Sequence, residues 1–280
     1  MSDAPRKPNE FTQEDEAIAS FREELKKRFP LPTPQSRPKK RAAGAALGLL
    51  LLGLSTGLAW FDPAYRIEDY ASAVGQRQTL QLADGSQVLL DSASKLVVSW
   101  HLRSRQVELQ AGQALFDVAP MRYRPFLVDA GTADVKVVGT RFNVSRRSND
   151  VLVTVAEGKV AVHGHAAPTT TFLEPGQQLR VHAGLPDQAI RVNVEDVIAW
   201  QDNRLVFEST PLSDVLEVVQ RYHPAPIQLV DRSLAGLPIS GVFDSEHVDS
   251  LISLLPSILP VSVSTGADGA VLIRDRAGKK

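Results

Sequence analysis

The chain has 280 residues, 43% of them apolar and 22% charged, a balance typical of folded rather than disordered proteins. A formal net charge of -1 provides no basic excess, which argues against direct DNA or RNA binding. Cysteine is absent, so disulfide bonds, thiolate metal sites and cysteine nucleophiles are excluded.

Residues 1–41 are predicted to form a short tail with one amphipathic helix, from about Thr12 to Phe29, followed by a proline-rich linker. A single helix cannot bury its own apolar face, so this face needs a partner or a membrane surface. A solvated, half-formed helix is the simpler interpretation, but three aligned phenylalanines favour a partner. The apolar face consists of Phe11, Ile18, Phe21, Leu25 and Phe29.

Residues 42–61 carry no charge and are long enough, as a helix, to cross the hydrocarbon core of a bilayer. Basic residues crowd the N-terminal flank and acidic residues predominate on the other, which predicts an N-terminus inside the cell. A cleaved signal peptide would normally lie nearer the N-terminus. We therefore expect an uncleaved transmembrane anchor.

Residues 62–185 change to short, alternating apolar runs separated by glycine-containing turns at roughly ten-residue spacing. This pattern predicts an all-β domain of stacked antiparallel hairpins, with Asp84-Gly85 as a hairpin turn.

Residues 186–198 are expected to be a linker, and residues 199–280 a small α+β domain of β-α-β repeats. Thr210 and Pro211 are predicted to open its first helix, as a cap and a first-position proline. A second helix is expected from Val248 to Leu255.

Two series of short motifs follow one another along the chain. The β-region motifs include Asp84-Gly85-Ser86, Gly112-Gln113-Ala114-Leu115-Phe116-Asp117-Val118, Val138-Gly139-Thr140-Arg141-Phe142-Asn143-Val144, Val155-Ala156-Glu157-Gly158-Lys159-Val160 and Pro175-Gly176-Gln177. The C-terminal motifs are Leu205-Val206-Phe207, Pro211-Leu212 and Ile239-Ser240-Gly241-Val242-Phe243. Each motif is weak alone, but the ordered β-region set is specific and resembles the periplasmic domain of FecR-type regulators. The C-terminal region resembles a secretin/TonB short N-terminal-like (STN-like) domain.

The resemblance implies an anti-sigma factor, a bitopic protein that crosses the inner (cytoplasmic) membrane once, with its C-terminal region in the periplasm. Its partners would be an extracytoplasmic-function sigma factor inside the cell and the signalling domain of a TonB-dependent outer-membrane receptor. Such relays usually regulate iron or siderophore uptake, and envelope and intramembrane proteases release the sigma factor. The five apolar residues of the tail helix would then be the sigma-binding residues.

The tail departs from the family, whose members usually carry a longer, three-helix anti-sigma domain with tryptophan-containing motifs. Residues 1–41 contain no tryptophan and only one predicted helix. A membrane-anchored periplasmic interaction or structural module without sigma control is therefore the alternative. A membrane-anchored hydrolase is a third possibility, for which we find no catalytic triad or metal cluster.

Some FecR-type proteins cleave themselves at a Gly-Thr bond by an N-to-O acyl shift, and Gly139-Thr140 matches that motif. From spacing alone, the pair would be a β-bulge glycine and a strand threonine. Such a single-turnover reaction would not make the chain an enzyme in the ordinary sense.

Other candidate features favour structural interpretations. His163 and His165 could share a strand face, but no carboxylate lies nearby in sequence, so we expect no metal site and no cofactor. Trp100 and Trp200 are predicted to lie in the core, and Asp84 and Ser86 to serve the turn. Six arginines are expected to form a solvated face, namely Arg103, Arg105, Arg122, Arg124, Arg146 and Arg147.

Overall fold

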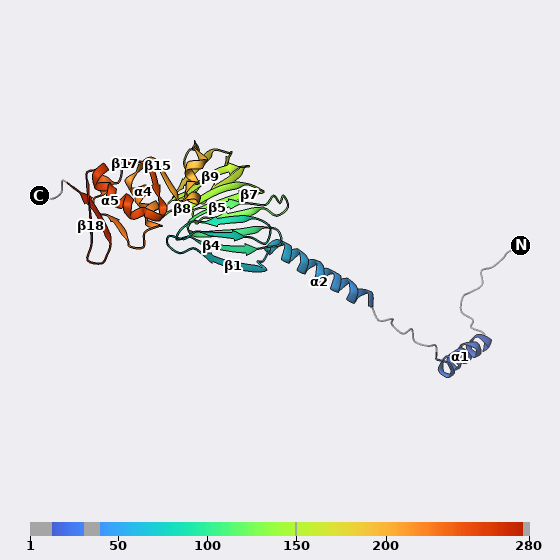
Figure 1. Cartoon of the computed structure of the whole chain (residues 1–280). Helices are drawn as coiled ribbons and strands as arrows, with labels where there is room; N and C mark the ends of the chain where they lie inside the picture. Colours follow the sequence, from blue (N-terminus) through green and yellow to red (C-terminus); the bar gives the residue numbers. More distant parts are fainter. Residues whose placement is uncertain (1–12, 31–39, 149, 277–280) are drawn as a thin grey trace. The chain divides into compact units, whose positions relative to one another are not determined.

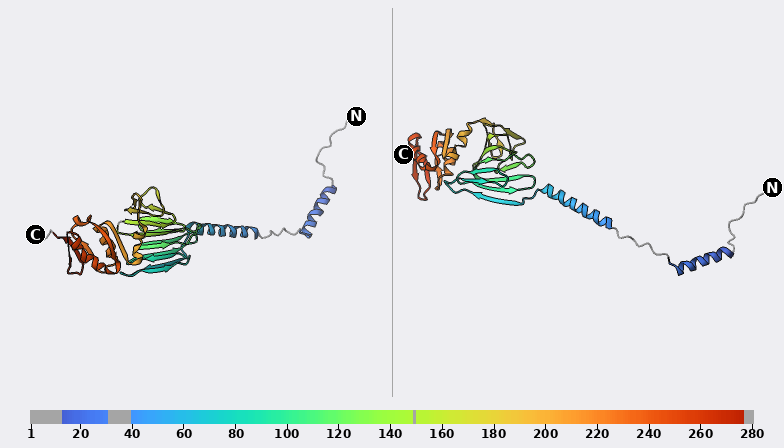
Figure 2. Two further views of the ribbon diagram at one scale, coloured as in Figure 1. Left: turned by 45° about the horizontal axis from the view of Figure 1, so that its top comes forward. Right: turned by 45° about the vertical axis from the view of Figure 1, so that its right-hand side comes forward.

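The computed structural model describes residues 13–30, 40–148 and 150–276. The chain separates into two compact units, Met1–Ser55 and Thr56–Lys280. The first holds helix α1 (Gln13–Arg28) and most of helix α2 (Lys40–Phe61), and the second holds all the strands (Figure 1 and Figure 2).

Helix α1 confirms the amphipathic helix predicted in the tail. It ends at Arg28, one residue before the predicted end at Phe29. Thr12 and Phe11 lie outside the described residues. Among the residues that the structure describes, no helix is both long enough and apolar enough to span a membrane.

Fourteen strands form the β region, which is mainly antiparallel as the sequence predicts. Pairing divides them into a first sheet, ordered β1-β4-β5-β6-β7-β10-β11, and a second, which contains β2, β3, β5, β8, β9 and β12, with β13 and β14 at the edge of β12. The strands are β1 (Arg66–Ala71), β2 (Gln78–Gln81), β3 (Gln87–Leu90), β4 (Lys95–Trp100), β5 (Arg105–Asp117), β6 (Phe126–Asp129), β7 (Ala133–Val137), β8 (Arg141–Arg146), β9 (Asp150–Glu157), β10 (Val160–Gly164), β11 (Thr170–Leu173), β12 (Gln177–His182), β13 (Leu185–Pro186) and β14 (Ile190–Arg191).

Strand β5 belongs to both sheets. Its first residues pair with β4 and β6, and the residues from Gly112 onward pair with β3 and β8. Gly112 has φ +84°, and a Cβ there would lie 2.6 Å from Cα of Ser94, so only glycine fits. The β5–β6 pairing is parallel, which corrects the prediction of antiparallel hairpins throughout.

The core between the two sheets is apolar and includes Trp100, as predicted. Phe116 stacks on Phe142 with ring centroids 5.0 Å apart and meets Phe126 edge-on at 5.9 Å. These contacts join β5, β6 and β8.

Arg105 and Arg147 correct the prediction of a solvated arginine face, because the side chain of Arg105 is fully buried and that of Arg147 is mostly buried. Arg105 is bound within the β region. Its Nη1 lies 2.6 Å from Oδ2 of Asp84, and its Nε donates to the carbonyl oxygen of Arg124 at 2.9 Å. Asp84 also accepts a hydrogen bond from the backbone N–H of Ser86 at 3.0 Å, which confirms the predicted turn role. The turn before β3 is thus bound to the start of β5.

Residues 186–198, expected to be a linker, are closely attached to the β region. Strands β13 and β14 pair with β12, and helix α3 (Val194–Val197) follows. A 3-10 helix (Ala199–Asp202) then buries Trp200, as predicted.

The C-terminal segment, residues 199–276, contains the predicted strands and both predicted helices. Strand β15 pairs with β17, while β19 lies between β16 and β18, in parallel with β16. The bounds are β15 (Arg204–Pro211), α4 (Leu212–Gln220), β16 (Ile227–Leu229), β17 (Pro238–Asp244), α5 (Val248–Ile258), β18 (Val261–Thr265) and β19 (Val271–Asp275).

The predicted start of α4 is wrong by one residue, because Pro211 was expected to be the first helical residue. Strand β15 continues through Pro211, and the helix begins at Leu212 without a side-chain cap. Thr210 does not cap the helix because it pairs with Ile239 of β17.

Replacing Arg105 by alanine should lower the free energy of unfolding by about 3–5 kcal/mol, because Asp84 would remain buried without its counter-charge. Denaturant unfolding followed by near-UV circular dichroism measures this. The exposed Arg122 is the control, and Arg122→Ala should change stability by no more than about 0.5 kcal/mol. Equal stabilities of the two variants would contradict this role of Arg105.

Candidate functional site

The C-terminal segment packs against the second sheet through a junction rich in buried polar groups. At its centre, the hydroxyl of Tyr222 donates to the carboxylate of Asp91, 2.7 Å from Oδ1 and 2.8 Å from Oδ2. Both side chains are buried, and Asp91 follows directly after β3. The hydrogen bond therefore links the end of β3 to the turn after α4.

Burial raises the pKa of the Asp91 carboxyl above its usual value. The positive charge of Arg221 and the Tyr222 hydrogen bond oppose this increase without cancelling it. Burial likewise raises the pKa of Tyr222, and the charge of Asp91 adds to the effect. The junction thus contains a carboxylate whose ionised form is poorly solvated.

Two further side chains of the β region hold the backbone of the C-terminal segment. Arg77 donates to the carbonyl oxygen of Trp200 and to the side chain of Asn203. The hydroxyl of Ser92 donates to the carbonyl oxygen of Arg221 at 2.5 Å. These bonds surround the Asp91–Tyr222 pair.

Two arginines of the β region bind Asp214 in the first turn of α4. Oδ2 of Asp214 lies 3.0 Å from Nη1 of Arg147 and 2.8 Å from Nη2 of Arg180. Burial alone would raise the pKa of Asp214, but the Arg180 hydrogen bond and the charge of Arg147 together lower it. Nearby, Glu217 accepts hydrogen bonds from the backbone N–H and the hydroxyl of Ser148.

Between these groups the junction contains apolar side chains together with a few buried hydrogen bonds. Leu115 of β5 belongs to the hydrophobic cluster of the C-terminal segment rather than to the core of the β region. Nε1 of Trp200 donates to Oδ1 of Asn143 at 3.3 Å, and Nε2 of Gln113 donates to the same oxygen at 3.1 Å. The junction therefore combines apolar packing with charged contacts.

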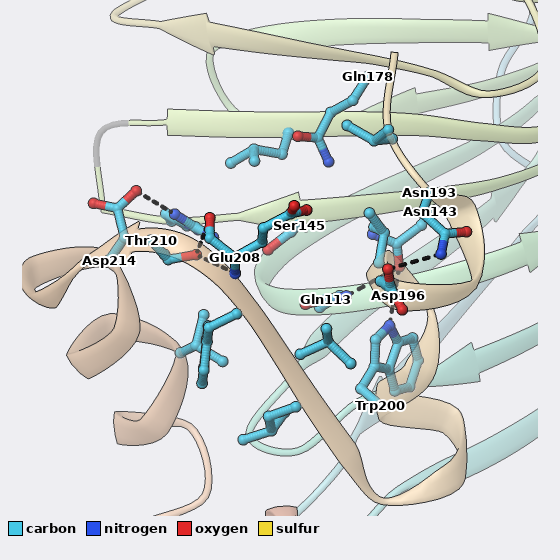
Figure 3. Close-up of a pocket in the computed structure, with 18 of the residues that line it drawn as sticks. Gln113, Asn143, Ser145, Gln178, Asn193, Asp196, Trp200, Glu208, Thr210 and Asp214 are labelled. Carbon is cyan, nitrogen blue, oxygen red and sulfur yellow. Dashed lines mark hydrogen bonds and ion pairs between the residues drawn. The ribbon is translucent and has the colours of Figure 1, made fainter. Parts of the chain in front are cut away.

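A cavity of about 720 Å³ opens beside these contacts. Figure 3 shows Asp214 and Glu208 at one side of it and Trp200 and Asn143 at the other. Its walls come from β8, β12 and the 190–197 segment on the sheet side, and from β15 and α4 in the C-terminal segment. A ligand in this cavity would contact both parts of the junction.

Gly139 and Thr140 lie in the connection between β7 and β8 and do not line this cavity. A Cβ on Gly139 would lie 2.7 Å from Cα of Pro120, so the glycine permits a close backbone approach. Thr140 is buried, and its hydroxyl donates to the carbonyl oxygen of Lys159 at 3.2 Å. The hydroxyl is therefore held by the backbone of the connection between β9 and β10.

Four of the five predicted sigma-binding residues lie on α1 or directly after it, and Phe11 lies outside the described residues. Ile18, Phe21, Leu25 and Phe29 are all exposed, from 46% at Leu25 to 71% at Phe29. The structure thus leaves this apolar face available to a partner.

No carboxylate lies near His165 in sequence, but the pairing of β7 with β10 brings one close to it in the fold. Nε2 of His165 lies 3.2 Å from Oδ2 of Asp134, and Asp129 completes a group whose possible ligand atoms lie within 4.8 Å of one another. All three residues are exposed, and such groups are common without a metal ion.

Sequence reasoning did not identify the junction residues as a site. Asp91 and Tyr222 are 131 residues apart, and no local pattern predicts that they meet. The one available signal was the position of Tyr222, which follows the buried face of α4.

Comparison with known proteins agrees with the architecture. Residues 68–161 match the model of the FecR family, described as FecR protein. The match covers about a third of the chain, and this matched segment is called the FecR domain below. It comprises β2 to β9 entirely, most of the first sheet and the Gly139-Thr140 pair.

Two crystal structures of candidate anti-sigma factors from Parabacteroides distasonis share the fold. The structure at 2.50 Å resolution has 23% sequence identity and a TM-score of 0.67, and covers 75% of this chain and 99% of its own. The structure at 1.65 Å has 24% identity and a TM-score of 0.66, and covers 74% and 99%. A comparison with curated protein sequences found no match.

The raised pKa of Asp91 predicts a specific pH dependence. Because the folded state holds this proton more tightly than the unfolded state, whose aspartate pKa is about 3.9, stability falls as the pH rises through the folded pKa. Asp91→Asn removes this contribution while keeping an acceptor for Tyr222.

Unfolding free energies of the wild type and Asp91→Asn, measured between about pH 4 and pH 7, should therefore diverge. The wild type should lose stability relative to the variant as the pH rises. Asp214→Asn is the control with the opposite sign, because the pKa of Asp214 is lowered. Parallel curves for the wild type and Asp91→Asn would contradict the assignment.

Proposed function

We propose that this chain is a membrane-anchored anti-sigma regulator. In this role, helix α1 binds an extracytoplasmic-function sigma factor in the cytoplasm, and the FecR domain and C-terminal segment lie in the periplasm. The observation that carries the proposal is the FecR domain preceded, across an uncharged stretch, by a helix with an exposed apolar face. The names of the two Parabacteroides proteins agree with it.

Support for anchoring comes from residues 42–61, which carry no charge and follow a basic flank. Leucines of α2 at positions 49 to 52 are all more than half exposed in the structure. Apolar side chains in water are unfavourable, and a bilayer would cover them. The chain would then cross the inner membrane once.

The signal would come from the signalling domain of a TonB-dependent outer-membrane receptor, and its physiological role would be the control of iron or siderophore uptake. The receptor would contact the C-terminal segment, and envelope and intramembrane proteases would then release the sigma factor. The junction supports this sequence of events because it contains a buried hydrogen-bonded pair and a poorly solvated ion pair, whose separation would let water reach them.

The sigma-factor step is tested by two double variants of α1. Phe21→Ala with Leu25→Ala removes two exposed apolar side chains, while alanine preserves the helix. We expect recovery of the sigma factor with the tagged, membrane-extracted protein to fall roughly tenfold or more, since buried anchors dominate interface energies.

The matched control is Arg22→Ala with Lys27→Ala on the same exposed helix, which should leave recovery unchanged. Equal recovery from both double variants would exclude α1 as the sigma-binding element. Recovery of envelope proteins without any sigma factor would favour the alternative, an anchored interaction module. The presence of only one helix in the described part of the tail supports that alternative.

Self-cleavage at Gly139-Thr140 is a further prediction. The Thr140 hydroxyl would attack the carbonyl carbon of Gly139, exchanging the amide for an ester and freeing the amine, and water would then cleave the ester. Thr140→Ala should abolish a fragment that starts at residue 140, whereas Thr140→Ser, which keeps a hydroxyl, should retain it. N-terminal sequencing of fragments from native membranes checks this, and an unchanged fragment in Thr140→Ala would contradict it.

A further inference from the structure

The cavity at the junction has a strongly cationic lining for its size. Five arginines line it against three carboxylates. Two of the arginines, Arg191 and Arg204, are exposed, and no hydrogen bond or ion pair engages their side chains among the described residues. The arginines are Arg147, Arg180, Arg191, Arg204 and Arg221, and the carboxylates are Asp196, Glu208 and Asp214.

Two of these arginines have unsatisfied donors. Nε of Arg147 and Nε of Arg221 are buried and have no hydrogen-bond partner within the described part of the chain. Buried polar groups in proteins are nearly always paired, with protein, water or a ligand. A guanidinium has donors only, so the missing partner must be an acceptor.

The same two arginines repel each other. Burial lowers the pKa of Arg147, and the neighbouring charge of Arg221 lowers it further, in spite of the Asp214 carboxylate. Asp214 is shared with Arg180, which also pairs with Asp150, and Glu217 lies near Arg147, so these carboxylates offset only part of the repulsion between Arg147 and Arg221. An additional anion would offset this repulsion.

We propose that this cavity binds a small organic oxyanion, a carboxylate or a phosphate attached to an apolar body, as a ligand that holds the C-terminal segment against the second sheet. Guanidinium groups bind both oxyanions through paired N–H donors. The apolar body would contact Trp200, Phe207 and Ile190, which also line the cavity. A volume of about 720 Å³ is in the range of small-molecule sites.

The ligand would act on both sides of the junction. Arg147 and Arg180 come from the β region, and Arg204 and Arg221 from the C-terminal segment. An anion bound between them stabilises the packed arrangement over any separated one, by mass action. The availability of an organic acid would thereby set how readily the junction opens, which adds a chemical input to the proposed receptor signal.

Isothermal titration calorimetry of the full chain tests the proposal with three probes at constant ionic strength: benzoate, phenyl phosphate and inorganic phosphate. We expect at least one of the two aromatic anions to bind, and to bind more tightly than inorganic phosphate because of its apolar body. The relative affinities of benzoate and phenyl phosphate distinguish a carboxylate ligand from a phosphate ligand. Titration up to a ligand concentration of about 10 mM detects even weak binding. If neither aromatic anion binds in this range, the proposal is overturned.

The double variant Arg191→Ala with Arg204→Ala should weaken binding roughly tenfold, since it removes two cavity charges without breaking a described structural contact. Lys95→Ala with Arg122→Ala changes the net charge equally at exposed positions outside the cavity, and should leave the affinity unchanged. Equal weakening in both double variants would mean nonspecific charge attraction only, and would overturn the site.

Hydrogen exchange provides the second measurement. The bound anion should slow exchange of the α4 amides, whereas α5, which does not line the cavity, should be unaffected. Binding without protection of α4 would overturn the proposed effect on the junction.

Discussion

The structure depends on the sharing of strand β5 between two sheets. Gly112 allows the strand to change direction because its φ of +84° and its contact with Ser94 leave no space for a Cβ. One end of β5 carries Arg105, which is buried against Asp84, and the other carries Leu115, which packs into the C-terminal hydrophobic cluster. The same strand therefore connects the two layers of the β region and supports the C-terminal segment.

The junction between these parts has the properties expected of an element that can be switched. Its apolar contacts provide adhesion, whereas its buried ion pairs contribute little net stability, because desolvation offsets much of their attraction. Removing or neutralising one member of a pair, however, leaves its partner buried without compensation. Neutralising Asp214 is thus expected to weaken docking, whereas protonating Asp91, whose pKa is raised, favours it. A bound anion would act through the same electrostatics.

Much of the fold was predictable from local sequence patterns. The short strands, the turn at Asp84, the buried tryptophans and the helices of the C-terminal segment follow from alternation, helical periodicity and turn chemistry. The motifs resembling FecR-type regulators lie largely within the residues that match the family.

The corrections and omissions share one physical cause, which is contact between residues far apart in the chain. Arg105 looks like a surface arginine in sequence, and only the approach of Asp84 allows its burial. The parallel pairing of β5 with β6, and the meeting of Asp91 with Tyr222, depend on tertiary structure that periodicity does not encode. Thr210 has a typical capping sequence, but pairing with β17 extends the strand through it.

The central claim is that α1 binds a sigma factor, and in-cell photocrosslinking tests it most directly. A photoreactive phenylalanine analogue at position 21 would replace an exposed side chain that is already aromatic. Mass spectrometry of the crosslinked species should identify an extracytoplasmic-function sigma factor, and the same analogue placed at position 172 on exposed β11 should not capture it. Crosslinks from position 21 only to lipid or to proteins other than a sigma factor would contradict the account.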